Sequence, residues 1–548
     1  MSTSIDTEID QLASHAARLA GVSLLELFRR EPGRTGWLTG SIGPVLVDCA
    51  KQPIDAGAWQ ALLDHARRLG VEAARDAMLA GGRVNVSEGR AALHALLRTP
   101  TGEVPAVLRA ESEAIAATLA RMAELVARLR QALPEQALPA VTDVVSVGIG
   151  GSELGPRLAC EALGGCHQGP RVHFLANVDG ERVARTCATL DPASTVVILV
   201  SKSFGTQETL LNGRVLRDWL VAALGREDAA TRLFAVSANV EAAQAFGVPA
   251  GQVLPMWDYV GGRFSLWSAA GLPVALALGM DGFRGLLAGA AQVDRHFRDA
   301  PLADNLPVRL ALLAWWNRVW LGRGSLCVVP YDDRLAALPG WLQQLEMESN
   351  GKRVTAQGEP VALPTVPVIW GSVGANAQHA YFQALHQGTD VVPVDFVGVV
   401  RPDHDLHGNH QALLANLLAQ GAALMAGRDR AAAHALLAGE TDPARREMLA
   451  AQTSFPGDRP SNTLLLDRLT PEALGALLAL YEHKTFVYAL LCGVNPFDQW
   501  GVELGKTLAA RLLPVLAGGD PGDGLDASTL ALAAHVRQRF APPPERPG

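Results

Sequence analysis

The chain has 548 residues, of which 49% are hydrophobic and 19% charged, so large cores can be buried and general disorder is not expected. A net charge of −8, with both signs interspersed, disfavours a nucleic-acid or anionic-membrane partner, although a local positive pocket remains open. The acidic start lacks the apolar region of a secretory signal, and six cysteines without a CxxC pair fit reduced thiols in a cytoplasm.

Hydrophobic spacing divides the chain into helical and alternating regions. Residues 1–130 are expected to be mostly amphipathic helix, as in "VSEGRAALHALLR". From about 141, short β-branched runs such as "STVVILVSKS" alternate with helical segments, which predicts a mostly parallel sheet flanked by helices. A helical stretch over 278–322 precedes a second alternating block, which could be a distant copy of the first. From about 462 we expect helix again, and then a frayed proline-rich tail.

The apolar runs are too short for a bilayer. "LPVALALGM" is an example, and a transmembrane helix needs about 20 apolar residues.

The lysines are more informative than the apolar runs, because the chain has 42 arginines and only five lysines. Positions that keep lysine could need a compact ammonium whose pKa can shift, although codon bias is an alternative. The five are Lys51, Lys202, Lys352, Lys484 and Lys506.

Two glycine- or hydroxyl-rich stretches follow predicted strands. "VGIGGSELGPR", 147–157, runs from a strand into a glycine cluster and a helix, but Glu153 replaces the third glycine of a dinucleotide fingerprint, so nucleotide binding is disfavoured. "VSKSFGTQETLLN", 200–212, places several hydroxyls at a helix N-terminus, where they would cradle a phosphate. An ordinary capping box is the alternative, yet capping needs one hydroxyl and four are present: Ser201, Ser203, Thr206 and Thr209.

Two further stretches present an arginine and a pair of glutamates. In "WDYVGGRFSLWSAAGLP", 257–273, a double glycine brings the backbone close to a neighbour and presents Arg263 to a pocket. In "WLQQLEMESNGKR", 341–353, a helix reaching residue 348 would place Gln344 and Glu348 on one face. Glu346 would point elsewhere, because two residues turn an α-helix by about 200°. The spacing therefore selects Glu348 as a possible base and leaves Glu346 a structural or solvated role.

Three histidine- or lysine-containing stretches need separate treatment. On one helix, His379, Gln383 and His386 would form a polar stripe, with buried and satisfied histidines as the alternative. "GVELGKT", 501–507, is one residue short of a P-loop and follows no clear strand, so ATP binding is rejected. His404, His407 and His410 could not face one metal from a helix, so zinc is not expected.

Together these stretches resemble the glucose-6-phosphate isomerase (phosphoglucose isomerase) family. The family patterns are close to GIGGSxLGP, SKTFTTxET, DxVGGRxSxWSxxGLP, QQxxMESNGK, GTNxQHxxxQxxHQGT and FDQWGVELGK, and this chain follows all six in order over residues 147–506. The segment 81–98 also looks like the family's N-terminal region. The resemblance implies an aldose–ketose isomerase of glycolysis and gluconeogenesis that interconverts glucose 6-phosphate and fructose 6-phosphate without metal or organic cofactor.

The resemblance also implies a domain plan and a set of residue roles. It implies two sugar-isomerase (SIS) domains, with 1–105 belonging to the large domain, 106–277 the smaller SIS domain, 278–500 the larger, and 501–548 a C-terminal arm. A cytoplasmic homodimer is implied, with His379 contributed across the interface. Glu348 matches the base, His379 and Lys506 the ring-opening residues, and Arg263 the arginine beside the enediolate. The implied substrate contacts are Gly151, Ser152, Ser201, Lys202, Ser203, Thr206, Thr209, Gly262, Gln344 and Gln499.

The departures from the family pattern remove no catalytic group. Ser203 replaces a threonine but keeps the hydroxyl, Gly205 loosens the phosphate loop, and Ala375 and Ala377 precede His379. A non-catalytic SIS sugar-phosphate sensor is the rival hypothesis, although it would not need Glu348. An isomerase that also accepts mannose 6-phosphate is a third reading, which the sequence leaves open.

Overall fold

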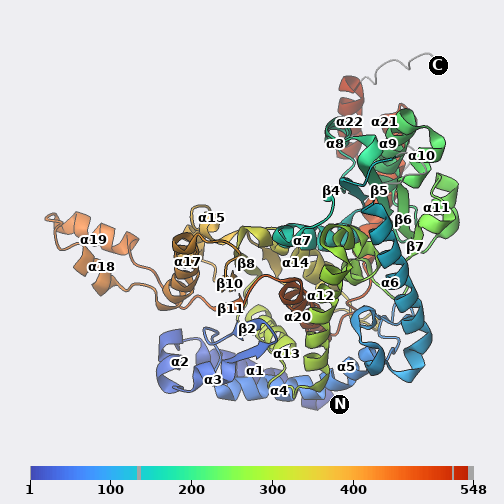
Figure 1. Ribbon diagram of the computed structural model, residues 1–548. Helices are drawn as coiled ribbons and strands as arrows, with labels where there is room; N and C mark the ends of the chain where they lie inside the picture. The colour runs from blue at the N-terminus through green and yellow to red at the C-terminus, as the bar shows by residue number, and fades with distance from the viewer. Residues whose placement is uncertain (1, 132–137, 521–523, 541–548) are drawn as a thin grey trace. The chain divides into compact units, whose positions relative to one another are not determined.

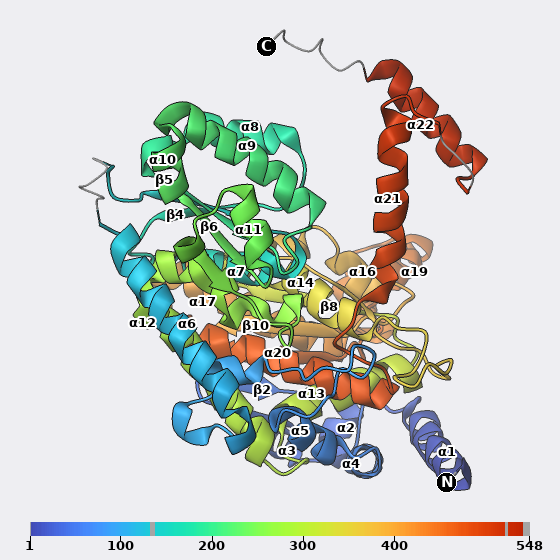
Figure 2. The ribbon, with the colours of Figure 1, turned by 90° about the vertical axis from the view of Figure 1, so that its right-hand side faces the viewer.

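The chain folds into two compact units, Met1–Phe497 and Asp498–Gly548. A computed structural model describes residues 2–131, 138–520 and 524–540 (Figure 1; Figure 2). The larger unit contains two β-sheets, and the smaller unit contains helices α21 (Glu503–Leu516) and α22 (Ala527–Arg539). The proline-rich tail at 541–548 lies outside the described residues. The predicted domain borders at 106, 278 and 501 stay predictions.

The first sheet has five strands, all parallel, in the order β4-β3-β5-β6-β7. The strands are β3 (Asp143–Val147), β4 (Arg171–Leu175), β5 (Thr195–Val200), β6 (Leu233–Ser237) and β7 (Val253–Pro255). The helices between them are α7 (Leu154–Ala162), α8 (Gly180–Thr189), α9 (Gln207–Leu224), α10 (Arg226–Thr231) and α11 (Val240–Phe246). The predicted parallel sheet flanked by helices is therefore confirmed.

Alternation along β5 explains why helices cover both faces of this sheet. Val196, Ile198 and Val200 pack into the core shared with α7 and α12 (Leu272–Asp299), whereas Val197 and Leu199 pack with α8 and α9. Successive side chains of a strand point to opposite faces, so a strand that is apolar at every position must be covered twice.

The strand order also fixes where the loops meet. The chain passes from β3 outward to β4 and then returns to β5 on the other side of β3. In open parallel sheets such a reversal leaves a crevice at the carboxyl ends of the two inner strands, where ligands bind. The loops after β3 and β5 are the two stretches that the sequence singled out, 148–153 and 201–206.

The second sheet has six strands in the order β1-β2-β11-β10-β8-β9. Its four parallel strands are β8 (Ser325–Tyr331), β9 (Val368–Trp370), β10 (Val394–Val399) and β11 (Ser461–Leu466). The order β9-β8-β10-β11 repeats the reversal of the first sheet, which supports a common origin for the two blocks. The helices of this part are α13 (Leu306–Trp315), α14 (Leu338–Leu342), α15 (Gly374–Gln378), α16 (Phe382–Gln387), α17 (His407–Ala426), α18 (Arg430–Leu436), α19 (Pro443–Gln452) and α20 (Pro471–Cys492).

The expectation that residues 1–130 are mostly helix is confirmed, although β1 (Thr39–Ile42) and β2 (Val45–Asp48) form an antiparallel hairpin there that pairs with β11. The expectation that helix resumes at 462 is wrong, because that residue lies within β11 and α20 begins at 471. Tertiary pairing decides both cases, since short strands gain stability only from their neighbours. The N-terminal helices are α1 (Ser2–Leu19), α2 (Leu24–Arg30), α3 (Arg34–Leu38), α4 (Ala56–Arg68), α5 (Val71–Leu79) and α6 (Arg109–Leu129).

Helices α12 and α20 pack against each other within the core that the two sheets share (Figure 1; Figure 2). The expectation that no apolar run could span a bilayer holds for the short run but not for this helix, because 269–299 is long and apolar enough by length and composition alone. Yet 67% of its most apolar window is buried in the fold, as in a core helix.

Buried polar contacts of Asp294 join α12 to α20 and to the segment before α6. Asp294 on α12 accepts from Arg98, with Nε–Oδ2 at 2.7 Å and Nη2–Oδ1 at 2.8 Å. His483 on α20 lies 2.6 Å from the same carboxylate. Burial by itself raises the pKa of Asp294, but Arg98 and His483 outweigh it and hold the pKa below the usual range.

Replacing Asp294 should destabilise the protein in a pH-dependent way. Asp294→Asn leaves the buried Arg98 charge without its bidentate partner, which should cost about 3 kcal/mol at pH 7. A carboxylate with a depressed pKa adds stability above about pH 4, the pKa of unfolded aspartate, and that stability is lost as the pH falls toward the folded pKa. Urea unfolding of wild type and Asp294→Asn at pH 7 and at about pH 3.5 should therefore show that the difference in unfolding free energy between them is smaller at the lower pH.

Asp281→Asn is the matched control. Asp281 lies on the same helix, is fully exposed and contacts Arg284 only at 3.5 Å. Its removal should change stability by less than about 0.5 kcal/mol. A gap for Asp294→Asn that stays constant or widens on acidification would contradict the assigned role.

Candidate active site

The loops after β3 and β5 lie against each other at the reversal of the first sheet. A Cβ built on Gly148 would lie 3.1 Å from the carbonyl oxygen of Val200 and 2.9 Å from the Cβ of Ser152. Gly150 adopts a φ of +61°, a conformation that glycine enters without strain. The glycine cluster therefore serves close approach of backbone segments, as the sequence indicated.

The loop after β5 forms a cradle of hydroxyl groups at the N-terminus of α9. Thr206 occupies the N-cap position, but its side chain makes no capping hydrogen bond and lies 3.1 Å from the Ser201 hydroxyl instead. The buried hydroxyl of Thr209 has no partner within the described residues, and Ser203 is exposed. The capping alternative is therefore wrong for Thr206, whose hydroxyl lies with that of Ser201 at a helix end, where anions are attracted.

Lys202 ties this cradle to the next loop. Its Nζ donates to the carbonyl oxygens of Asp258 at 3.0 Å and Val260 at 3.4 Å, and it lies 3.4 Å from the Asp258 carboxylate. Burial lowers the pKa of Lys202, while Asp258 opposes that effect. Val260 directly precedes the double glycine. Lys202 therefore connects the loop after β5 to the turn that carries Arg263.

The turn at Gly261–Gly262 lies in direct contact with Gly151. A Cβ at Gly151 would overlap the carbonyl group of Gly262 and the backbone nitrogen of Arg263, so only glycine fits there. The Ser265 hydroxyl donates to the Gly151 carbonyl at 3.3 Å and holds the same contact. A 3₁₀-helix, Gly262–Trp267, starts at this turn and carries Arg263 on its first winding.

Arg263 is buried and held on several sides. Its Nε donates to the Ser349 hydroxyl at 2.7 Å, and its Nη2 donates to the Pro496 carbonyl. Its Nη1 lies 3.3 Å from Oε2 of Glu348. The Arg263 side chain is 2% exposed and that of Glu348 22%, so the carboxylate remains partly accessible beside a fixed guanidinium.

The helix that carries Glu348 runs on from α14 as a π-helix, Gln343–Glu348. Helical structure thus reaches residue 348, as the spacing argument required, and π-helical turns often occur at functional sites. The Gln344 amide faces the glycine loop, since a Cβ on Gly150 would lie 2.9 Å from its Nε2, and its buried Oε1 has no partner within the described residues.

Glu346 points away from this cluster into the core. It is 1% exposed and accepts from Nζ of Lys484 at 2.7 Å. Burial raises the pKa of Glu346 against the opposing pull of Lys484. The prediction that the two glutamates face different ways is confirmed, and the role of Glu346 is a buried structural one rather than a solvated one.

A run of buried polar residues on α20 holds the elements around Glu348 and Arg263. Glu482 accepts from Nε1 of Trp267 at 2.8 Å, at the end of the 3₁₀-helix that begins beside Arg263. Lys484 holds Glu346 on the π-helix, and the Thr485 carbonyl accepts from Asn350 at 3.3 Å just after it. One core helix therefore fixes both the arginine and the glutamate segments.

His379 is exposed and does not join the cluster within this chain. It follows the last residue of α15, and the backbone turns before α16 begins at Phe382. The predicted polar stripe of His379, Gln383 and His386 is therefore wrong, because no single helix spans it. Gln383 contacts Gln387 at 2.6 Å and His386 contacts Gln420 at 2.9 Å instead.

Two predicted site residues belong to the smaller unit. Lys506 is exposed on α21 and forms an ion pair with Glu503 at 2.8 Å. Gln499 precedes a 3₁₀ turn, Trp500–Val502. The stretch 501–507 forms no P-loop, because it lies in a 3₁₀ turn and the first turns of α21 rather than in a loop between a strand and a helix.

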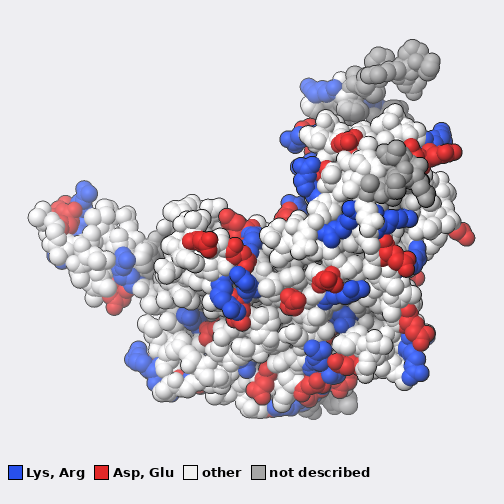
Figure 3. All heavy atoms as spheres, viewed as in Figure 1, with Lys and Arg blue, Asp and Glu red and all other residues white. Residues whose placement is uncertain are grey.

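The histidine cluster near α17 has a different geometry from the one assumed. His404 precedes the helix, and His407 is its first residue. The rings of His404 and His410 lie edge-on to each other, with their centroids 6.0 Å apart. Among the described residues, no group of three histidine, cysteine or acidic side chains could hold a metal ion. Basic and acidic side chains are mixed on the face shown in Figure 3.

Sequence reasoning missed two residues of this region. Ser349 binds the guanidinium of Arg263, and Nζ of Lys352 donates to the carbonyls of Glu348 at 3.0 Å, Ser349 at 2.8 Å and Asn495 at 3.0 Å. The scarcity of lysine was a signal for Lys352, since an ammonium with three donors suits three convergent carbonyls.

The arrangement can bind an anion and move a proton. An anionic group fits the hydroxyl cradle at α9, and the carboxylate of Glu348 lies beside a rigid cation that could stabilise a developing oxyanion. Such a pair suits proton abstraction next to a carbonyl, because the charge that forms on oxygen is then neutralised by a group already in place.

Comparison with known proteins gives concordant matches. The family described as Phosphoglucose isomerase matches residues 48–533. A glucose-6-phosphate isomerase of Stenotrophomonas maltophilia is 52% identical over 514 residues, 93% of this chain and 95% of that protein. One from Brucella canis is 46% identical over 543 residues, 98% and 99% of the two chains. The crystal structure of a glucose-6-phosphate isomerase from Chlamydia trachomatis superposes with a TM-score of 0.83 at 30% identity, covering 96% of this chain and 98% of that one.

Replacing Gly151 should disturb the contact that positions Arg263. Gly151→Ala forces the added methyl against the Gly262 carbonyl, and such overpacking should cost about 1–3 kcal/mol of stability. Gly164→Ala is the control, because a Cβ at Gly164 meets nothing within 4 Å. Chemical unfolding of both variants measures the difference, and equal stability of the two would show that the glycine contact is not tight.

Proposed function

Since the chain belongs to the phosphoglucose isomerase family, we propose that the site around Glu348 and Arg263 interconverts glucose 6-phosphate and fructose 6-phosphate. The observation that carries the proposal is the Glu348–Arg263 pair at 3.3 Å, in the same compact unit as the hydroxyl cradle at α9. The reaction belongs to glycolysis and gluconeogenesis, and it requires no cofactor in this mechanism.

Glu348 is the proposed base of the isomerisation. It takes the proton from C2 of the open-chain aldose and returns it to C1, so an enediolate forms between the two steps. The guanidinium of Arg263, fixed by Ser349 and Pro496, stabilises the negative oxygen of that intermediate. Gln344 lies one helical turn before Glu348 and is proposed to contact the sugar with Gly151, Ser152 and Gly262.

The phosphate of the substrate is proposed to bind at the N-terminus of α9. Ser201, Ser203, Thr206 and Thr209 supply hydroxyl groups, and the buried hydroxyl of Thr209, which has no partner among the residues that the structure describes, supports this assignment. Backbone N–H groups and the helix dipole add to the attraction. Lys202, expected among the substrate contacts, supports the loop from its bonds to Asp258 and Val260.

Ring opening requires a second acid–base pair, because one carboxylate cannot serve the distant ring oxygen as well. We assign this step to His379 and Lys506, with Gln499 as a further sugar contact. His379 is exposed in a single chain, which is what a residue contributed to a neighbouring subunit requires. The proposal therefore includes a homodimer in the cytoplasm, in which each site takes its histidine from the partner chain.

The rival functions lack support. A non-catalytic sugar-phosphate sensor would not need the buried and preorganised Arg263 beside Glu348. The similar proteins named above are glucose-6-phosphate isomerases, and no observation favours mannose 6-phosphate as an additional substrate.

Removing the carboxylate of Glu348 should abolish turnover while keeping the fold. Glu348→Gln is expected to lower kcat for fructose 6-phosphate by about 10³-fold, the size of a general acid–base effect. KM should change little, because the phosphate cradle is untouched. A coupled assay of glucose 6-phosphate formation measures both constants.

Glu346→Gln is the matched control on the same helix. It weakens the buried pair with Lys484, so it should lower stability while the kcat of the folded fraction stays within about tenfold of wild type. Activity of Glu348→Gln within a few-fold of wild type would refute the assignment of the base. An inactive wild-type protein that still binds fructose 6-phosphate would favour the sensor.

Hybrid dimers test whether His379 acts across an interface. Glu348→Gln and His379→Ala should each be nearly inactive as homodimers. If the histidine comes from the partner, a hybrid dimer has one site with both residues intact, and random 1:1 reassociation restores about a quarter of wild-type activity. Mixing without any recovery, once hybrids are verified by native mass spectrometry, would place His379 in its own chain's site or outside the mechanism.

A further inference from the structure

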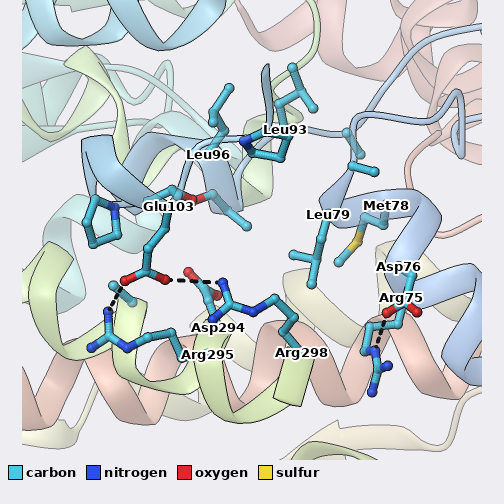
Figure 4. A pocket seen from close by; sticks show the side chains of 17 residues that line it. Arg75, Asp76, Met78, Leu79, Leu93, Leu96, Glu103, Asp294, Arg295 and Arg298 are labelled. Carbon is cyan, nitrogen blue, oxygen red and sulfur yellow. Dashed lines mark hydrogen bonds and ion pairs between the residues drawn. The ribbon is translucent and has the colours of Figure 1, made fainter. Parts of the chain in front are cut away.

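A second cavity lies in the larger unit, and none of its lining residues belongs to the proposed isomerase site. It measures about 420 Å³, within the range of small-molecule pockets. Figure 4 shows that its walls come from α5, from the segment between residues 92 and 105, and from α12. The cavity is open enough for a ligand to enter, since Arg295 and Arg298 at its edge are 39% and 41% exposed.

The lining combines apolar and charged side chains. Met78, Leu79, Leu93 and Leu96 supply apolar surface, Arg295 and Arg298 project from α12, and the Arg75–Asp76 pair lies beside Met78 on α5 (Figure 4). A site of this kind suits a molecule with an apolar body and one charged end, because each part then meets its own kind of surface.

The charged side already holds one carboxylate. Glu103 lies between the two arginines, with Oε1 3.3 Å from Nη1 of Arg295 and Oε2 3.1 Å from Nη1 of Arg298 (Figure 4). These are single, partly exposed contacts, and such ion pairs contribute little to stability. Glu103 therefore shows that a carboxylate fits between the two guanidinium groups. Because its contacts are weak, a ligand carboxylate can displace it.

The arginines keep donors for a ligand. Within the described residues Arg295 makes only the contact to Glu103, whereas a guanidinium has five N–H donors. Arg298 is held from behind by Asp299 through two bonds of 2.7 and 2.9 Å, so its orientation is set in advance. Arg298 therefore loses little freedom when its Nη1 binds a carboxylate, and Arg295 supplies most of the donors that remain.

The other acidic residues of the lining, Asp294 and Asp76, do not compete with a ligand for Arg295 and Arg298. Asp294 is shared between Arg98 and His483, and its oxygens are engaged at 2.6–2.8 Å. On the opposite side, Asp76 pairs with Arg75 at 2.8 Å. Glu103 is therefore the one lining carboxylate whose partners are the cavity arginines Arg295 and Arg298.

We propose that this cavity binds a small monocarboxylate with an apolar body, its carboxylate on Arg295 and Arg298 and its body against Leu93 and Leu96. A cationic ligand would instead use Glu103, and a neutral apolar ligand would use the leucines alone. The three kinds of ligand would respond differently, in binding affinity, to the same substitutions.

Hexanoate is the probe, titrated into the full-length protein by isothermal calorimetry without sugar phosphate. We expect saturable binding that Arg295→Met weakens by about tenfold, the effect of losing one charge-assisted contact. Glu103→Gln should bind hexanoate several-fold more tightly, because it removes the internal competitor and keeps the side-chain shape. Hexan-1-ol, which lacks the carboxylate, should bind about tenfold more weakly than hexanoate.

Arg284→Met is the control on the same helix, since among the described residues Arg284 contacts only Asp281, and it does not line the cavity. It should bind hexanoate as wild type does, and circular dichroism should show all variants folded. No saturable binding to wild type and to Glu103→Gln would overturn the proposal. So would unchanged affinity in Arg295→Met, weaker binding by Glu103→Gln, or equal affinity for hexan-1-ol. The readout is binding in the absence of substrate, so it is independent of isomerase activity.

Discussion

The structure around the proposed active site depends on one helix, α20, whose central turn is polar and completely buried. Charged and polar groups are costly to bury unless each one is paired, so every residue of this turn imposes a partner on a neighbouring element. The partners come from α12, from β10, from the end of the 3₁₀-helix that carries Arg263, from the π-helix of Glu348 and from the segment just after it. The residues concerned are Tyr481, Glu482, His483, Lys484 and Thr485, and their partners are Asp395, Trp267, Asp294, Glu346 and Asn350.

The two sheets share a strand order but use its crevice differently. In the first sheet the loops after β3 and β5 carry glycines and hydroxyls, and the hydroxyl of Thr209 has no partner in the described part of the chain. In the second sheet the corresponding loops after β8 and β10 carry charges that satisfy each other, because Arg334 pairs with Asp332 and Asp403, both at 2.7 Å. A crevice closed by its own ion pairs offers an anion little, so the proposed phosphate site lies in the first sheet alone.

Local patterns predicted those features whose cause is local. The parallel sheets follow from runs of β-branched residues, and the opposite directions of Glu346 and Glu348 follow from helical spacing. Patterns failed where a distant segment decides the outcome. The hairpin at 39–48 becomes a sheet edge only because β11 is available, and the turn at 379–381 breaks a helix that the spacing of His379 and His386 favoured.

The sequence by itself supplied the proposed chemistry: the motif types, the preference for Glu348 over Glu346 as the proposed base, and the hydroxyl-rich loop before α9. Residue types and their spacing suffice for these because they concern neighbours along the chain. Only the tertiary structure decided that Gly151 touches Gly262, that Arg263 lies 3.3 Å from Glu348, and that Lys484 neutralises Glu346. Those contacts join segments far apart in sequence, and they exist because both sheets contribute to one core, within which α12 and α20 pack against each other.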